Sequence, residues 1–393
     1  MTETISRTGR PAVGRPVRVG AGATVTTIAC VLPVFLVGGL AVQLGDELGF
    51  SPAGLGLAVS VYFGISALAS VPSGALVERY GPAPVARVAI VLSAGSLLAV
   101  AGLARSYPTL VALLALSAAG NALGQLASNA ALAEHVPAHR QGLSFGVKQA
   151  AIPFSTLLAG AAVPTVALTA GWRWAFVAAA GAALAALPAV PRSDRDRRTR
   201  SASAARGGRR AALVVVGLAA TLAAGAANAL GTFLVDSSAA RGLSPGLAGL
   251  TLTLGGAVCV SARVGVGWLA DRRAGGHVGV VAGLLVAGSV GLLLLAVADP
   301  VPLVAGVVLG FGLGWAWPGL LTFAVVRLHP QAPAAATSIT QTGVYAGGCL
   351  GPLGLGALAG TAGYPAMWLT AAGSMLLAAL LMLLAARLLS RPA

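Results

Sequence analysis

The chain has 393 residues, of which 57% are hydrophobic and only 9% are charged, whereas an average soluble domain carries about 25% charged residues. That composition excludes a water-soluble protein. An apolar helix needs roughly 20 residues to cross the ~30 Å hydrocarbon core of a bilayer, so twelve such helices would use most of the chain. Little sequence is left for a soluble domain.

Twelve apolar stretches, separated by polar segments, are predicted to be transmembrane helices. They lie at residues 20–43, 52–77, 83–104, 107–133, 142–167, 172–191, 211–235, 244–270, 276–298, 300–328, 332–361 and 363–389. The 54 glycines suit closely packed membrane helices, because small residues let two backbones approach each other. The predicted fold class is therefore an all-α, multi-pass integral membrane protein.

The net charge of +15 raises the question of nucleic-acid binding, which the positions of the basic residues answer. Twenty arginines fall on the side of the two chain ends, and three fall on the other side: Arg105, Arg173 and Arg241. The positive-inside rule then places both termini in the cytoplasm and the chain in the cytoplasmic membrane. We expect a lipid bilayer and no nucleic acid as partner. Cys30, Cys259 and Cys349 have no paired spacing, so no metal site or cofactor is expected.

The two halves of the chain repeat each other on either side of the polar segment 191–210. Residues match at a constant shift of 193 or 192: Gly49, Ser51, Pro52, Gly74, Glu78, Arg79, Gln149 and Gly171 return as Gly242, Ser244, Pro245, Gly267, Asp271, Arg272, Gln341 and Gly363. The predicted organisation is a tail at 1–19, a six-helix bundle at 20–191, a basic linker at 192–210, a second bundle at 211–389 and a tail at 390–393. We expect a monomer with a site between the bundles near the bilayer midplane.

The repeated element carries a family resemblance. "GALVERYG" at 74–81 and "GWLADRR" at 267–273 resemble the G-x-L-x-D-R-x-G loop motif of the major facilitator superfamily, although the first copy has Glu78 in place of aspartate. The resemblance implies two pseudo-symmetric bundles and secondary transport by alternating access. It also implies a gating role for Glu78 and Arg79 and for Asp271 and Arg272.

Two cations are predicted to lie deep in the membrane. Lys148 comes eight residues after Arg140 and Arg263 comes eight residues before Asp271, so both sit ~12 Å from the cytoplasmic boundary. No acidic residue is expected at that depth, which indicates an anionic substrate because a buried charge is costly. Lys148 is the only lysine in the chain, and an ammonium can lose its proton on burial. The alternative is a lysine that reaches to the cytoplasmic surface.

Arg263 fits a narrower pattern. "RVGVGWLAD" resembles the eighth span of monocarboxylate transporters and oxalate exchangers, where an arginine binds the substrate carboxylate. A guanidinium suits a carboxylate because it offers paired hydrogen bonds. An arginine at this place is also able to tether the cytoplasmic gate, and the sequence leaves both readings open.

Polar and aromatic residues extend the candidate site. Asn121, Gln125 and Asn129 recur every four positions and share one helix face. In the resembled fold the spans that carry them line the central cavity. The full set of expected substrate-binding residues is Lys148, Arg263, Gln149, Gln341, Asn121, Gln125, Asn228, Tyr62, Trp315 and Tyr345.

The alternatives are an exporter, an enzyme and a non-transporting sensor. Drug and proton antiporters usually carry G-x-x-x-G-P in the fifth span, and here that span reads "KQAAIPFSTLLAGAAVP". The histidines fall at helix ends without a catalytic cluster, so we expect no enzyme. Asp236 and Lys148 are the titratable candidates for proton coupling. Proton symport, exchange against a counter-anion and facilitated diffusion all stay open.

Overall fold

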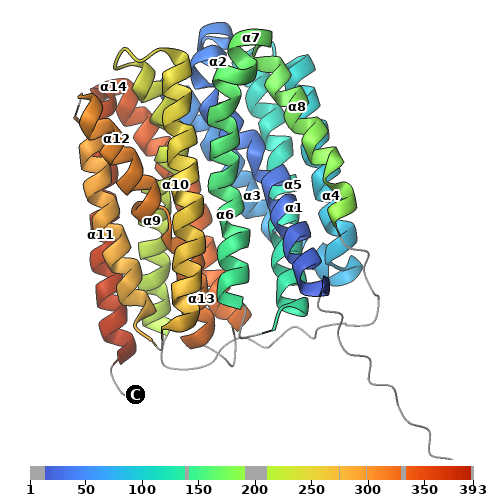
Figure 1. Cartoon of the computed structure of the whole chain (residues 1–393), viewed down its shortest axis with the longest axis vertical. Helices are drawn as coiled ribbons and strands as arrows, with labels where there is room; N and C mark the ends of the chain where they lie inside the picture. Colours follow the sequence, from blue (N-terminus) through green and yellow to red (C-terminus); the bar gives the residue numbers. More distant parts are fainter. Residues whose placement is uncertain are drawn as a thin grey trace, which may run out of the picture.

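The computed structural model describes residues 14–137, 141–190, 210–273, 275–297, 299–328 and 333–390. Within these ranges the chain is helical, and the helices stand side by side as a single bundle (Figure 1). The predicted linker at 192–210, except for Arg210 at the start of α9, and most of both predicted tails lie outside the described residues. The exact domain boundaries therefore stay a prediction.

The first half of the chain forms helices α1 to α8. Their bounds are α1 Gly14–Gly39, α2 Ala41–Leu48, α3 Pro52–Tyr80, α4 Pro82–Leu103, α5 Tyr107–His135, α6 Gln141–Ala162, η2 Val163–Ala167, α7 Leu168–Ala170, α8 Trp172–Ala185 and η3 Leu187–Ala189. The second half forms α9 Arg210–Ala239, α10 Pro245–Arg272, α11 His277–Leu295, α12 Pro300–Leu309, η4 Gly310–Gly314, α13 Trp317–Leu328 and α14 Pro333–Ser390.

Twelve membrane-crossing segments emerge from the described residues once the kink in α14 is taken into account. Eleven stretches are long and apolar enough to cross a bilayer, and the last of them, Ile339–Leu389, is divided by Gly363 (φ 81°) into two helices. We call the end of the bundle where α1 begins and α14 ends the terminal face, and the end that carries α2 and α7 the far face (Figure 1). The chain is thus an all-α, multi-pass membrane protein, as the hydropathy predicts.

The repeat is visible in the backbone as well as in the sequence. Ser51 and Ser244 each accept a hydrogen bond from the main-chain N–H three residues later, and a proline follows each serine at the first helical position. This is a favourable helix start, because the side chain satisfies an amide that the helix cannot. Gly171 and Gly363, which are also repeat partners, take positive φ angles of 97° and 81° between the last two spans of each half.

Three segments depart from the predicted spans. The first span ends at Gly39 and is followed by a separate helix, α2, rather than running to residue 43. The fifth and tenth spans are interrupted by the π-helical segments η2 and η4. Hydropathy does not distinguish a π turn from an α turn, since both satisfy the backbone within the helix.

Glycines bring the two halves of the chain into backbone contact in the part of the bundle next to the far face. A Cβ at Gly38 would lie 2.5 Å from Gly231 O, and one at Gly160 would lie 2.5 Å from Gly249 O. A Cβ at Gly56 would overlap Pro352 O. The halves are therefore tightly closed against each other on this side, which is the close approach that small residues permit in membranes.

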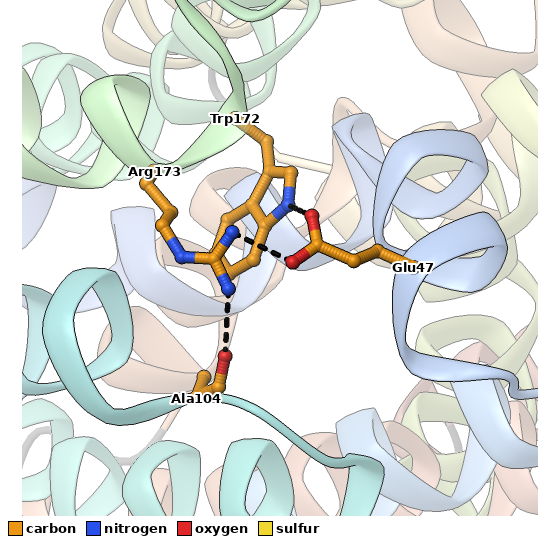
Figure 2. A network of polar contacts seen from close by, with 4 residues as sticks. All are labelled: Glu47, Ala104, Trp172 and Arg173. Atoms are coloured by element: carbon orange, nitrogen blue, oxygen red, sulfur yellow. Dashed lines mark hydrogen bonds and ion pairs between the residues drawn. The ribbon is translucent and has the colours of Figure 1, made fainter.

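A polar network ties three helices of the first half together at the far face. Glu47 on α2 accepts a hydrogen bond from Trp172 Nε1 at 2.5 Å and pairs with Arg173 Nη1 at 2.7 Å, and Arg173 Nη2 donates to Ala104 O at 3.2 Å (Figure 2). Ala104 is the residue that ends α4, so the arginine also satisfies a carbonyl at a helix C-terminus. The hydrogen bonds from Trp172 and Arg173 hold the pKa of Glu47 below its ordinary value.

Candidate functional site

A cavity of about 90 Å³ lies between the two halves. Its wall combines side chains from α1, α3, α5 and α6 with side chains from α9, α10, α13 and α14. The lining residues are Val31, Phe35, Phe63, Asn121, Gln125, Leu126, Asn129, Gln149, Ile152, Ala224, Asn228, Arg263, Trp315, Trp317, Pro318, Leu321, Thr322, Thr340, Gln341, Val344 and Tyr345. None of these described residues is an aspartate or a glutamate.

Arg263 is the only cation in this wall, among the residues that the structure describes, and it is only 2% exposed. Its Nε donates to Trp315 O at 2.9 Å and its Nη1 donates to Gln149 O at 2.5 Å. The guanidinium also lies 5.6 Å from the centre of the Trp315 ring. Its Nη2 is buried and has no hydrogen-bond partner among the described residues. The arginine is thus held in place by neutral carbonyls, and no carboxylate of the described part of the chain pairs with its charge.

The two carbonyls are free to accept because the helices that carry them are interrupted. In a regular helix, Gln149 O would accept the N–H of residue 153, but that residue is Pro153, which has no N–H. Trp315 stands between η4 and α13, at a break in the tenth span. The sequence therefore supplies two unused acceptors at the point where Arg263 needs them. The bond to Gln149 joins α10 of the second half to α6 of the first.

Lys148 is fully inside the protein, at 1% exposure, but it does not belong to the cavity lining. Its ammonium donates to Gln125 Oε1, which does line the cavity. Lys148 lies near enough to Arg263 for the two charges to interact. Both predicted cations therefore lie in the same region, and the Gln125 side chain lies between Lys148 and the cavity.

The predicted amide residues all belong to the cavity wall. Asn121 Nδ2 donates to Ser66 Oγ at 3.0 Å, and Asn228 Nδ2 donates to Ala224 O, one turn earlier in its own helix, at 2.8 Å. Gln149 and Gln341 line the cavity from repeat-related positions on α6 and α14. These side chains give the apolar wall several neutral polar groups.

The aromatic residues divide between the cavity and the surrounding core. Trp315 and Tyr345 line the cavity, and Trp315 packs edge-on against Phe35 at a ring distance of 5.8 Å. Tyr62 is not a lining residue, because its hydroxyl donates to Cys30 O at 2.8 Å and its side chain is fully buried. Its predicted contact with substrate has no support from this position.

The two copies of the predicted gating motif end α3 and α10 at the terminal face. Asp271 Oδ2 accepts the Leu143 N–H at 3.0 Å, which connects α10 to the N-terminus of α6 in the other half. Arg272 lies over the ring of Trp268 at 3.6 Å. Glu78 and Arg79 are exposed, and Arg79 lies 5.3 Å from the ring of its neighbour Tyr80. The described contacts therefore connect the two halves through the second copy of the motif.

Asp236 lies near the far end of α9, away from the cavity lining. Its Oδ2 accepts a hydrogen bond from the Tyr364 hydroxyl of α14. Asp46 on α2 is close enough for the two carboxylates to interact. In the part of the chain that the structure describes, no three His, Cys, Asp or Glu side chains come together where they would hold a metal ion.

Sequence reasoning missed one contributor to the site: Pro153, which leaves free the carbonyl that holds Arg263. A proline four residues after Gln149 was a readable signal for the free carbonyl. Trp317, another aromatic residue of the tenth span, lines the cavity with a buried indole.

These features define a class of protein: a membrane protein with two repeated helical halves and a polar, charged cavity enclosed between them. The family model of the Major Facilitator Superfamily matches residues 23–352 and 216–393. The chain therefore belongs to the major facilitator superfamily. It is a membrane transporter and not an enzyme. A search of curated proteins finds no match.

Solved structures of the same fold cover nearly the whole chain. A bacterial homologue of the human lysosomal transporter Spinster, in an inward-facing and occupied conformation, aligns with a TM-score of 0.69 at 14% identity, over 96% of this chain and 97% of that one. The human organic anion transporter MFSD10 aligns with a TM-score of 0.68 at 19% identity, over 95% of this chain and 100% of that one. At these identities the similarity shows the fold alone.

Proposed function

We propose that this secondary transporter moves a small organic anion, such as a carboxylate, and that Arg263 is its principal anchor. The observation that carries the proposal is a buried guanidinium in the cavity between the halves, with one donor unpaired and no carboxylate among the described lining residues. A buried charge without a counter-ion is costly, and an anionic ligand would remove that cost. MFSD10, which has the same fold, is a human organic anion transporter.

Lys148 strengthens the preference for an anion. A second positive charge close to Arg263 raises the local potential, and the potential favours one negative ligand over neutral or cationic ones. Because its ammonium is held by Gln125, we assign Lys148 a positioning role through that amide, and it stays our candidate for a proton carrier together with Asp236. Protons and a counter-anion are the two coupling partners that this assignment allows.

We propose that the transporter works by alternating access, and the way the halves are joined supports this mechanism. The far side is closed by glycine contacts, and at the terminal side Asp271 connects α10 to α6. Opening the far side requires the glycine contacts to separate while the terminal side closes around the site. Arg263 takes part in this motion, because its bond to Gln149 O crosses between the halves. An anion that competes for the guanidinium would thus couple binding to the movement.

We place the terminal face in the cytoplasm, on the strength of the arginine asymmetry. A cysteine at Ser106, which is exposed at the far face, tests this placement with a membrane-impermeant thiol reagent in intact cells. Labelling of Ser106→Cys is expected, whereas Arg327→Cys at the terminal face should react only after the cells are broken. The opposite pattern would reverse the orientation.

The substrate class is tested by a thermal-shift screen of the purified protein against carboxylates, cationic drugs and sugars. We expect stabilisation by carboxylates, and a loss of about 10- to 150-fold in affinity for Arg263→Gln, because a charge-assisted contact contributes roughly 1.5–3 kcal/mol. Arg263→Lys should also bind weakly, since an ammonium lacks the paired donors.

Arg87→Gln is a matched control, because Arg87 Nη2 likewise donates to a carbonyl, Val190 O, but outside the cavity. It should leave carboxylate binding unchanged. Stabilisation by cationic drugs alone, or normal carboxylate binding in Arg263→Gln, would contradict the proposal and favour a proton-coupled exporter instead.

A further inference from the structure

Three buried polar atoms of the cavity residues have no hydrogen-bond partner within the described part of the chain, and together they indicate which groups a ligand would need. They are Arg263 Nη2, Trp317 Nε1 and Asn121 Oδ1. Each side chain is at most 2% exposed. A buried polar atom without a partner costs about 1–3 kcal/mol, and native proteins rarely leave several of them around one cavity. A ligand that satisfied all three would offset that cost.

The first two atoms are donors and come from the second half of the chain. Arg263 Nη2 carries a charge, and the indole N–H of Trp317 can only donate. Both therefore require an acceptor on the ligand, and an anionic oxygen suits a charged and a neutral donor acting together. Trp317 begins α13, directly after the break that also frees the Trp315 carbonyl.

The third atom is an acceptor and comes from the first half. Ser66 Oγ donates its single hydrogen to Ala118 O at 3.1 Å, so towards Asn121 it can only accept. The group that Asn121 presents to Ser66, at 3.0 Å, must therefore be its NH₂. This leaves Asn121 Oδ1 as the unused atom, which requires a ligand group with an N–H or O–H.

We propose that the substrate is an amphipathic organic anion that also carries a hydrogen-bond donor, with its anionic group bound by Arg263 and Trp317 and its donor bound by Asn121. Phe35, Phe63 and Trp315 supply apolar wall for the rest of the molecule. The ligand would connect the two halves, since its acceptor end meets α10 and α13 and its donor end meets α5. This inference rests on the proposed function and specifies the substrate class of the same site.

Three related compounds test the inference by equilibrium binding to the purified full chain. Phenyllactate has the anion and the donor, phenylpropionate has the anion without the hydroxyl, and phenyllactamide has the hydroxyl without the charge. We expect phenyllactate to bind about three- to tenfold more tightly than phenylpropionate, as one additional hydrogen bond predicts. The amide should bind most weakly.

The variants assign each contact. Trp317→Phe keeps the ring and removes the N–H, so it should weaken both anions about three- to tenfold. Asn121→Leu should abolish the preference for phenyllactate over phenylpropionate while leaving phenylpropionate unchanged. Trp368→Phe is the matched control, because Trp368 Nε1 is also buried and unpaired but lies outside the cavity lining. It should change neither anion.

The outcomes separate this inference from the proposed function. If both anions bind in an Arg263-dependent manner but Trp317→Phe and Asn121→Leu change nothing, the inference is overturned and the anion transporter stands. If phenyllactamide binds as well as phenyllactate and Arg263→Gln has no effect, both are overturned. Absence of binding by phenyllactate at millimolar concentration also contradicts the inference, and a carboxylate found by the thermal-shift screen would still support the proposed function.

Discussion

The halves of the chain meet along two related seams, α3 with α14 and α6 with α10, and the seams are alike at one end and different at the other. Near the far face, Gly56 packs on Pro352 in one seam and Gly249 packs on Gly160 in the other. These positions correspond under the repeat, since 249−56 is 193 and 352−160 is 192. The closing contacts of the far side have been preserved in both copies.

Deeper in the bundle the correspondence breaks. Arg263 and Lys148 lie in the α6–α10 seam, and the same shifts of 193 and 192 place Ser70 and Thr340 in the α3–α14 seam. The proline that frees the Gln149 carbonyl is also unique to one seam, because Pro153 corresponds to Tyr345. The contacts that close the far side therefore occur in both copies of the repeat, whereas the two cations lie in the α6–α10 seam.

The largest effect is expected from disrupting the close glycine contacts that both seams have near the far face. Gly56→Ala places a Cβ on the Pro352 carbonyl, and overpacking of this kind costs typically 1–3 kcal/mol because backbone cannot move aside as a side chain can. The far-closed state should lose population by about 5- to 150-fold. Spin labels at Ser106→Cys and Asp299→Cys, in the far-face loops of opposite halves, should report longer distances.

Two further variants sharpen this test. Gly249→Ala should act in the same direction, because its Cβ would meet Gly160 O at 2.8 Å in the related seam. Gly95→Ala, where no atom lies within 4 Å of the new Cβ, should leave the distances unchanged. Unchanged distances in both Gly56→Ala and Gly249→Ala would mean that these contacts do not hold the far side closed.

The second prediction addresses the unique proline. Pro153→Ala restores the N–H that a regular helix would direct at Gln149 O, so Arg263 Nη1 must share its acceptor. Anion affinity should fall about three- to tenfold, which is the effect of about one hydrogen bond. Thermal stability should rise, because a proline inside a helix is unfavourable.

Opposite changes in affinity and stability are diagnostic here, since general damage would lower both. Pro72→Ala in α3 is the control: Pro72 is exposed and also lies inside a helix, but away from Arg263. It should raise stability and leave anion binding alone. If Pro153→Ala bound anions normally, the freed carbonyl would have no role in positioning the arginine.

The third prediction compares the two copies of the motif at the terminal face. Asp271→Asn weakens a charge-assisted hydrogen bond to the N-terminus of α6, so about 1 kcal/mol, or a roughly fivefold shift towards a terminal-open state, is expected. Glu78→Gln should shift the populations less than about twofold, since Glu78 makes no hydrogen bond or ion pair to the second half among the described residues. Distances between spin labels at His135→Cys and Arg327→Cys measure the population shift in each variant. Equal shifts would mean that the two copies of the motif do not differ in their effect on the terminal face.

Sequence alone predicted most of the architecture, because hydropathy and the repeat are properties of the whole chain, whereas the orientation inferred from the charge bias stays a prediction. The twelve crossing segments were predicted from hydropathy. The repeat paired Ser51 with Ser244 and Gly171 with Gly363, and the structure places these pairs at helix starts and at turns with positive φ. The π turns η2 and η4 were not predicted, since they depend on how neighbouring helices pack.

The sequence indicated which residues belong to the candidate site, but not how their side chains are oriented. Depth along a helix placed Lys148 and Arg263 at one level, but the rotation of each helix decides which side chain faces the cavity. Arg263 lines it, while Lys148 turns to Gln125. Tyr62 was expected beside substrate and instead donates to a carbonyl of α1. Side-chain partners of this kind are set by tertiary packing, which one sequence does not reveal.

The smallest effect is expected for the far-face network of Glu47, Trp172 and Arg173. The described residues of the second half form no charged equivalent of this network. Trp172 and Arg173 correspond to Tyr364 and Pro365, so among the described residues only the first half pairs a carboxylate, that of Glu47, with an arginine. The pKa of Glu47 is lowered in the folded protein, chiefly by the Trp172 hydrogen bond and then by Arg173. Its stabilising effect is therefore complete above the ordinary glutamate pKa and is lost as the pH falls through the lowered value.

We expect the melting temperature of the wild-type protein to exceed that of Glu47→Gln at pH 7, and the difference to shrink as the pH falls below about 4, where Glu47 becomes protonated. The difference should be small, because the Glu47 side chain is 46% exposed and water screens the pair. Glu78→Gln, which removes another exposed glutamate that has no ion pair among the described residues, is the matched control and should show no such convergence. A difference that stayed constant down to pH 3 would mean that Glu47 contributes through packing rather than charge, and the far-face ends of the two halves would then be alike in their electrostatics.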